Sequence, residues 1–196
     1  RGLMNYYQNF PFWRTFFTKL DFNLVLSDES DRQIITSSLE TMASETCLPV
    51  ELMHGHVLNL IEKGVDYVFL PFIVNSKGEK ENPTNNCNCP WIQSHPYLLK
   101  AAFTDDDIRK KLLIPSLHFR YFDRALRKEL RDFFSEKFSI SGSKISRAVD
   151  EADKAQAEFE QQVRIKGQEV FKNLNGSIRK VIILGRPYNT GDPMLN

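Results

Sequence analysis

Blocks of apolar residues at helical spacing alternate with short continuous apolar runs along this chain. The helical pattern predicts helices over residues 9–20, 32–42, 49–63, 94–102, 122–137 and 143–174. The predicted apolar faces are Trp13, Phe16, Phe17 and Leu20 in the first helix, Ile35, Leu39 and Met42 in the second, and a seam of Ile145, Val149, Ala152, Phe159, Val163 and Val170 in the last. Residues 27–31, which end at Asp31, have the composition of a turn and helix cap, and Ser94 could cap the fourth helix. The short apolar runs predict strands over residues 22–26, 65–70, 112–117 and 180–184. Strands that alternate with helices indicate a parallel sheet with right-handed crossover connections. The predicted fold class is therefore α/β, with a parallel sheet flanked by helices.

The same pattern predicts how the chain is organised. Residues 1–140 form an α/β domain that contains the cysteines, and residues 141–176 form a long connecting helix with small residues on one face and charges on the other. Residues 177–196 are then the first strand and turn of a second α/β unit. Because the chain starts at Arg1 rather than at methionine, and stops soon after a strand-like run, we expect a fragment of a longer polypeptide.

Composition excludes several classes of protein. The chain has 196 residues, of which 41% are hydrophobic and 26% charged, as in ordinary globular domains. A net charge of +1 gives no field that would attract nucleic acid. No apolar stretch approaches the ~20 residues of a membrane-spanning helix, and no signal peptide is visible. Three cysteines do not suggest a secreted disulfide scaffold, so a cytoplasmic protein is expected.

The cysteines are the strongest candidates for chemistry. Cys47 lies two residues before Pro49, and Cys89 directly before Pro90, so each precedes a predicted helix, one on either side of the strand at 65–70. The positive end of a helix favours a thiolate, and also the negative charge of a thiolate-ligated iron–sulfur cluster. The alternative is that these cysteines are small buried apolar residues. The spacing of Cys87 and Cys89 is too short for a Cys-x-x-Cys zinc knuckle.

Other polar residues are weaker candidates. His54 and His56 are two positions apart on a predicted helix and point to nearly opposite sides, so they cannot hold one ion together. His95 is close enough in sequence to Cys89 to line the same pocket. Arg186 and Tyr188 follow the strand at 180–184, at the kind of strand end where α/β sheets bind ligands. Arg186 could hold a phosphate or carboxylate there, or it could be a surface arginine in a turn.

Two further patterns bear on binding. The polar stretch 75–88 is a long loop, of a length that is usually functional or disordered. No phosphate-binding Gly-x-x-x-x-Gly-Lys-Ser/Thr loop, dinucleotide-binding Gly-x-Gly-x-x-Gly or Gly-x-Ser-x-Gly elbow is present. The chain is therefore not expected to bind ATP or a dinucleotide by these routes.

A set of motifs in a fixed order suggests a family. The motifs are Ser44-Glu45-Thr46-Cys47-Leu48-Pro49, His54-Gly55-His56, Lys63-Gly64-Val65-Asp66-Tyr67-Val68-Phe69-Leu70-Pro71, Cys89-Pro90 and Gly185-Arg186-Pro187-Tyr188-Asn189. In this order they resemble the uncharacterised domain of CoA-enzyme activases. Those large proteins are related to the activators and components of 2-hydroxyglutaryl-CoA dehydratase and benzoyl-CoA reductase. The resemblance covers nearly the whole chain.

The resemblance implies Rossmann-like α/β subdomains and a role in anaerobic, ATP-driven electron transfer. Cys47 and Cys89 match the cysteines that can hold a [4Fe-4S] cluster, and Cys87 is an extra thiol. ATP would bind to a separate actin-like domain, and an acyl-CoA dehydratase is an implied partner. At least one more cluster ligand is expected beyond Asn196, and a further strand before Arg1. The alternative function is a non-catalytic scaffold that docks a partner or binds an acyl or CoA ligand.

Overall fold

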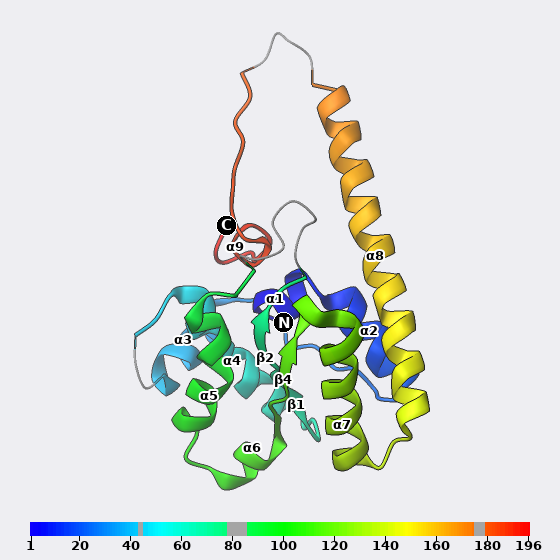
Figure 1. Ribbon diagram of the computed structural model, residues 1–196. Coiled ribbons are helices and arrows are strands. Elements are labelled where there is room, and N and C mark those ends of the chain that lie inside the picture. Colours follow the sequence, from blue (N-terminus) through cyan, green and yellow to red (C-terminus); the bar gives the residue numbers. More distant parts are fainter. Residues whose placement is uncertain (43–44, 78–85, 175–178) are drawn as a thin grey trace.

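The fold is a helical body built around short parallel strands, with one long helix extending beyond it (Figure 1). A computed structural model describes residues 1–42, 45–77, 86–174 and 179–196. The described helices are α1 (Leu3–Tyr7), α2 (Phe10–Lys19), α3 (Arg32–Thr41), α4 (Leu48–Glu62), α5 (Pro90–Ala102), α6 (Asp106–Lys111), α7 (Arg127–Phe138), α8 (Gly142–Lys172) and α9 (Pro187–Thr190). The strands are β1 (Val68–Phe69), β2 (Phe72–Asn75), β3 (Leu112–Leu113) and β4 (Ser116–His118), and a π-helix (Phe122–Leu126) leads into α7. None of the described helices is long and apolar enough to cross a membrane.

Local sequence signals place the helices well. The Asp31 side chain accepts a hydrogen bond from the backbone of Ile34 and begins α3, as its cap position predicts. Gly64, with a positive φ of 73°, directly follows the last turn of α4. One cap prediction is wrong, because Ser94 lies inside α5 rather than at its start. Pro90 suits the first helical position, so the helix begins one turn earlier than predicted.

The strands form one parallel ladder that is interrupted by prolines. β1 pairs with β3 and β2 pairs with β4, both in parallel. Between the two pairs, Leu70 N–H donates to Leu113 O at 2.8 Å and Phe72 N–H donates to Pro115 O at 2.8 Å. Because Pro71 and Pro115 have no N–H to donate, the ladder divides there. The fold is thus broadly α/β with parallel pairing, as predicted, although these two-stranded sheets do not make a clear Rossmann-like sheet.

Two predicted strands do not form in the described residues. Residues 22–26 are extended but unpaired, and Leu24 and Val25 are 37% and 41% exposed. They line a cavity of about 480 Å³ that β1 also lines. Residues 180–184 are likewise unpaired, with side chains that are far more exposed. An apolar run forms a strand only if a neighbouring strand is present to pair with it. In these two places the described chain provides no such neighbour.

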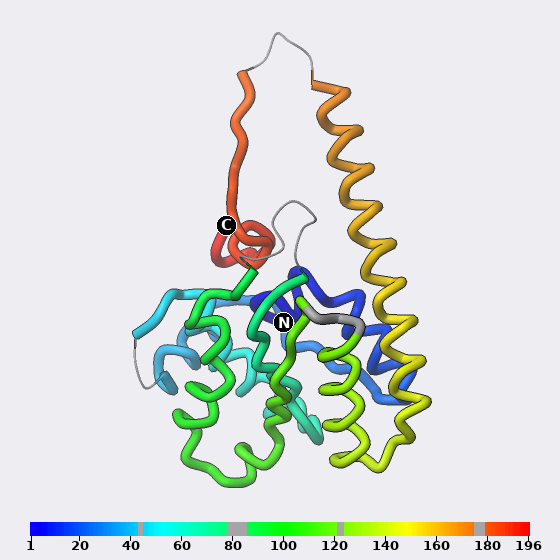
Figure 2. The backbone as a smooth tube through the Cα atoms, in the orientation of Figure 1, coloured from blue at the N-terminus to red at the C-terminus, as the bar shows by residue number. Residues whose placement is uncertain are grey.

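Buried side chains form two clusters that divide the body. The first joins α2, α7 and the start of α8, and it contains the predicted buried face of α2, which is Trp13, Phe16, Phe17 and Leu20. The second joins α1, α4, α5 and α9. Figure 2 shows that the chain leaves the first group of helices along α8 and that its C-terminal segment lies beside the second group. The predicted apolar seam of α8 is buried at Ile145, Val149 and Ala152. Farther along the seam, Phe159 and Val163 line a pocket that Phe12 and Pro187 also line, and Val170 is 52% exposed.

The contact between α3 and α4 is close, and it corrects the predicted face of α3. Ile34 and Ser38 are buried against α4, whereas Leu39, predicted to be in the core, is 54% exposed. Ser38 rather than Leu39 faces α4 because the N–H of Gly55 donates to Ser38 Oγ at 2.9 Å. A Cβ atom on Gly55 would lie 2.1 Å from Ile34 O, so only glycine allows this approach.

We expect Gly55→Ala to lower the free energy of unfolding by about 3 kcal/mol, because the added methyl group forces the two helices apart. Urea unfolding followed by circular dichroism measures the change. Gly167→Ala is the matched control, since a Cβ there meets nothing within 4 Å. That variant should be neutral or up to ~1 kcal/mol more stable. Equal effects of the two substitutions would contradict this account of the α3–α4 contact.

Candidate functional site

The two principal candidate thiols lie at the starts of two neighbouring helices. Cys47 is the N-cap residue of α4 and Cys89 is the N-cap residue of α5. Both helices carry proline in the first turn, and they pack against each other. Both thiols are exposed. Each cysteine therefore sits at the positive end of a helix dipole, facing solvent.

Tyr188 packs near the starts of both helices that carry the thiols. It lies on α9, is 9% exposed and belongs to the same buried cluster as Val50 of α4 and Ile92 of α5. Val50 and Ile92 each lie three residues after the N-cap cysteine of their helix, so the Tyr188 ring lies near the first turns of α4 and α5. Burial raises the pKa of Tyr188.

Cys87 is held in a different way. It forms an isolated antiparallel bridge with Asn75, at the end of β2. The next residue, Asn88, is buried and fixes the segment: its side-chain amide donates to Ile73 O at 3.0 Å, and its Oδ1 accepts from Ser76 Oγ at 2.9 Å. The predicted loop 75–88 is therefore ordered at both ends, while residues 78–85 lie outside the described residues. Within the described parts of the chain, no three His, Cys, Asp or Glu side chains converge as a metal site.

His95 lies in α5, and its ring is buried rather than open to the thiols. It is 3% exposed, and its Nδ1 lies 2.6 Å from Ile92 O. Pro96 follows it and has no N–H for that carbonyl, so the His95 Nδ1–H supplies the missing donor. Burial lowers the pKa of His95 to about 4. Its Nε2 and the Nδ1 of His54 have no hydrogen-bond partner among the residues that the structure describes.

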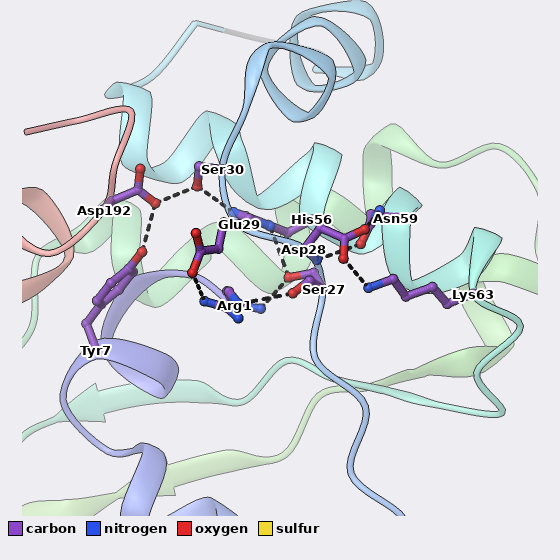
Figure 3. Close-up of polar contacts among 10 residues, drawn as sticks. All are labelled: Arg1, Tyr7, Ser27, Asp28, Glu29, Ser30, His56, Asn59, Lys63 and Asp192. Atoms are coloured by element: carbon purple, nitrogen blue, oxygen red, sulfur yellow. Dashed lines mark hydrogen bonds and ion pairs between the residues drawn. The ribbon is translucent and has the colours of Figure 1, made fainter.

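His56 points to the other side of α4, as the two-residue spacing predicts, and enters a chain of buried polar groups (Figure 3). Its Nδ1 lies 3.0 Å from Ser27 Oγ and its Nε2 lies 3.1 Å from Ser30 Oγ. Ser30 Oγ donates to Asp192 Oδ2 at 2.5 Å, so Nε2 carries the proton that Ser30 accepts. Tyr7 O–H donates to the same carboxylate oxygen at 2.8 Å. Burial lowers the pKa of His56 to about 4, which keeps the ring neutral at pH 7.

Sequence patterns do not reveal this polar chain. Ser27, Ser30 and Asp192 all lie in stretches that have the composition of exposed turns, yet each is at most 5% exposed. Asp192 follows Gly191, whose Cβ position is 3.1 Å from the Tyr7 ring. The carboxylate therefore anchors the segment after α9 to α1 and to the loop before α3. By fixing this segment, it also fixes Tyr188 and Arg186 beside the thiols.

A [4Fe-4S] cluster places clear requirements on the residues that bind it. Such clusters are normally held by four thiolates, and their charge is stabilised by nearby dipoles and positive groups. Cys47 and Cys89 have the exposure and the helix N-terminal positions that suit thiolate ligands. No third donor converges with them in the described residues, so these residues alone do not complete a cluster site.

We expect Asp192→Ala to release the segment after α9, because two hydroxyl groups then lose their charged acceptor inside the body. Amide exchange of residues 187–191 should become at least about 10-fold faster. Hydrogen exchange with mass spectrometry measures this rate. Asp66→Ala, at an exposed position, is the control and should leave the rate unchanged. An unchanged rate in Asp192→Ala would show that the apolar contacts of Tyr188 hold the segment alone.

Acid should destabilise the fold through His95. Its pKa is about 4 in the folded protein against 6.5 when free, so unfolding takes up a proton between these values. Its contribution is complete above pH 6.5 and is lost as the pH falls toward 4, by at most about 3 kcal/mol. Urea titrations from pH 4 to 7.5 should show a shallower acid loss for His95→Gln than for the parent. A parental slope in His95→Gln would contradict the prediction.

A family model described as the CoA enzyme activase uncharacterised domain matches residues 1–196. No curated protein and no solved structure matches the chain.

Proposed function

Because the chain belongs to the family of the CoA enzyme activase uncharacterised domain, we propose that it is the thiol-bearing part of an activator-like protein. Its task is to help deliver electrons to an enzyme of CoA-thioester chemistry. Cys47 and Cys89 contribute two thiolate ligands to a [4Fe-4S] cluster, and the remaining ligands come from outside the described residues. The cluster supplies one-electron transfer when it is bound.

One observation carries the proposal: both cysteines are exposed N-cap residues of two helices that pack against each other, and the first turns of both helices contribute to the buried cluster that holds Tyr188. Buried structural cysteines would lie separately in the two apolar clusters. Instead, the helix ends offer backbone N–H groups and positive potential to an anionic group held between them. Arg186, exposed at the start of α9, adds a positive charge to the same neighbourhood.

The remaining roles follow from the family resemblance. ATP would bind to a separate actin-like domain and drive the electron transfer, and an acyl-CoA dehydratase of the 2-hydroxyglutaryl-CoA type would receive the electrons. Cys87, which is bridged to Asn75, is left outside the ligand set. Such low-potential chemistry belongs in an anaerobic cytoplasm, in keeping with the sparse cysteines.

The test is anaerobic reconstitution of the full-length gene product with iron and sulfide, followed by iron analysis and EPR spectroscopy. Cys47→Ala and Cys89→Ala should each lose more than about half of the bound iron, since a cluster tolerates few missing thiolates. Cys87→Ala is the matched control and should keep the parental iron content and EPR signal. An iron-free parent protein, or full iron content in both Cys47→Ala and Cys89→Ala, would refute the proposal.

A second candidate is a non-catalytic scaffold that docks a partner or binds an acyl or CoA ligand. It is favoured by the lack of a third converging donor among the described residues and by exposed apolar side chains beside each thiol. Leu48 is 40% exposed and Trp91 is 45% exposed. In the reconstitution experiment this candidate predicts no iron above background in the parent protein.

A further inference from the structure

Cys87 and Cys89 are exposed thiols separated by one residue, and the proposed function uses only the second of them. The chain is extended at this point. Cys87 forms an antiparallel bridge with Asn75, and the next N–H, that of Asn88, donates to Val74 O at 3.1 Å. Successive side chains of an extended chain point to opposite sides. The two cysteines therefore share the outer side, while Asn88 points inward and is buried.

Asn88 holds this arrangement in place. It is 7% exposed, and its side chain bonds to Ile73 and Ser76 as described above. Its backbone O accepts from Gln93 Nε2 at 2.7 Å, and its backbone N–H is paired with β2. Each polar group of Asn88 thus has a partner in the body. Because the residue between them cannot turn, the two thiols are held as neighbours that both face solvent.

The spacing of these thiols is within reach of a disulfide bond. An extended chain rises about 3.3 Å per residue, so the Cα atoms of Cys87 and Cys89 lie roughly 6.6 Å apart. Disulfide bonds join Cα atoms that are about 4.4–6.8 Å apart. The pair therefore lies at the upper end of the usual range. A small adjustment of the backbone allows the bond to form, and a bond of this kind is readily reduced.

The two thiols have different surroundings, which give them different roles. Cys89 is the N-cap residue of α5, where free backbone N–H groups favour an anionic sulfur, whereas Cys87 lies outside the helix. The thiolate is the form that peroxides oxidise, and cysteines that sense oxidants are exposed and often lie next to a second, resolving thiol. Cys89 has the first position and Cys87 the second. Cys47 is also an exposed N-cap residue, but no cysteine is near it in the sequence.

We propose that Cys89 and Cys87 are a reversible, peroxide-sensitive thiol pair. The Cys89 thiolate attacks one oxygen of hydrogen peroxide and the O–O bond breaks. With one proton from solvent, the products are a sulfenic acid on Cys89 and a water molecule. The Cys87 sulfur then attacks the Cys89 sulfur and displaces hydroxide, which takes the Cys87 proton and leaves as a second water. In total the two thiols lose two electrons and two protons, which the peroxide gains.

The disulfide protects a thiol that would otherwise be lost. A sulfenic acid without a resolving thiol is oxidised further to a sulfinic acid, which thiols do not reduce. With Cys87 beside it, Cys89 stops at a disulfide that small thiols reduce again. While it is oxidised, Cys89 cannot bind iron. This last consequence rests on the proposed function, because it takes Cys89 to be a cluster ligand, whereas the disulfide itself does not.

Peptide mapping by mass spectrometry, on the iron-free full-length gene product treated with hydrogen peroxide, tests the pair. Trypsin leaves Cys87 and Cys89 together on the peptide of residues 81–100, and Cys47 on a separate peptide. The first peptide should lose two hydrogen atoms and regain them with dithiothreitol. Cys47, the matched control in the same sample, should gain two oxygen atoms that dithiothreitol does not remove. A disulfide from Cys89 to any other cysteine, or sulfinic acid on Cys89 to the same extent as on Cys47, would overturn the proposal.

The variant Cys87→Ser tests the role of the resolving thiol. Its side chain is exposed, so the substitution leaves the buried contacts of Asn88 in place. Sulfinic acid on Cys89 should rise at least about 5-fold over the parent at the same peroxide dose, because no neighbouring thiol stops the oxidation. An unchanged amount would overturn the proposal. Iron content separates the two proposals: a disulfide in a protein that takes up no iron refutes the cluster alone, and iron uptake without the disulfide refutes the thiol pair alone.

Discussion

The buried carboxylate of Asp192 is the contact on which the candidate site depends. It is 3% exposed and pairs with no cationic side chain of the described residues. Its hydrogen bonds come from the hydroxyl groups of Tyr7 and Ser30 and from the backbone N–H of Met194. These donors come from α1, from the loop before α3 and from the end of the described chain. A carboxylate satisfied in this way ties three distant parts of the sequence together. Tyr188 and Arg186 lie a few residues before it and take their positions from it.

His56 extends the same constraint into α4. Since Ser30 donates to Asp192, His56 must donate to Ser30 from Nε2 and accept from Ser27 at Nδ1, so one tautomer of a neutral ring satisfies the whole chain. The helix that carries this ring also begins at Cys47. The polar chain therefore sets the position of α4 relative to the segment that carries Tyr188. The distance between thiol and hydroxyl depends on side chains that touch neither of them.

Local chemistry was predictable from the sequence, and long-range pairing was not. Pro49 and Pro90 place the starts of α4 and α5, and with them the positions of Cys47 and Cys89. The two-residue spacing of His54 and His56 also predicts that they face different neighbours. No local signal shows that Asp192 is buried, because Gly-Asp-Pro is typical of an exposed turn. The partner that buries it lies 162 residues earlier, at Ser30.

The two strand predictions and the α3 face prediction that proved wrong share one cause, which is contact with distant parts of the chain. Residues 22–26 and 180–184 have strand composition, but a strand exists only with a neighbour, and the described chain brings none to either. The face of α3 was misjudged because Gly55 lets Ser38 approach α4, a contact that the periodicity of α3 alone does not contain.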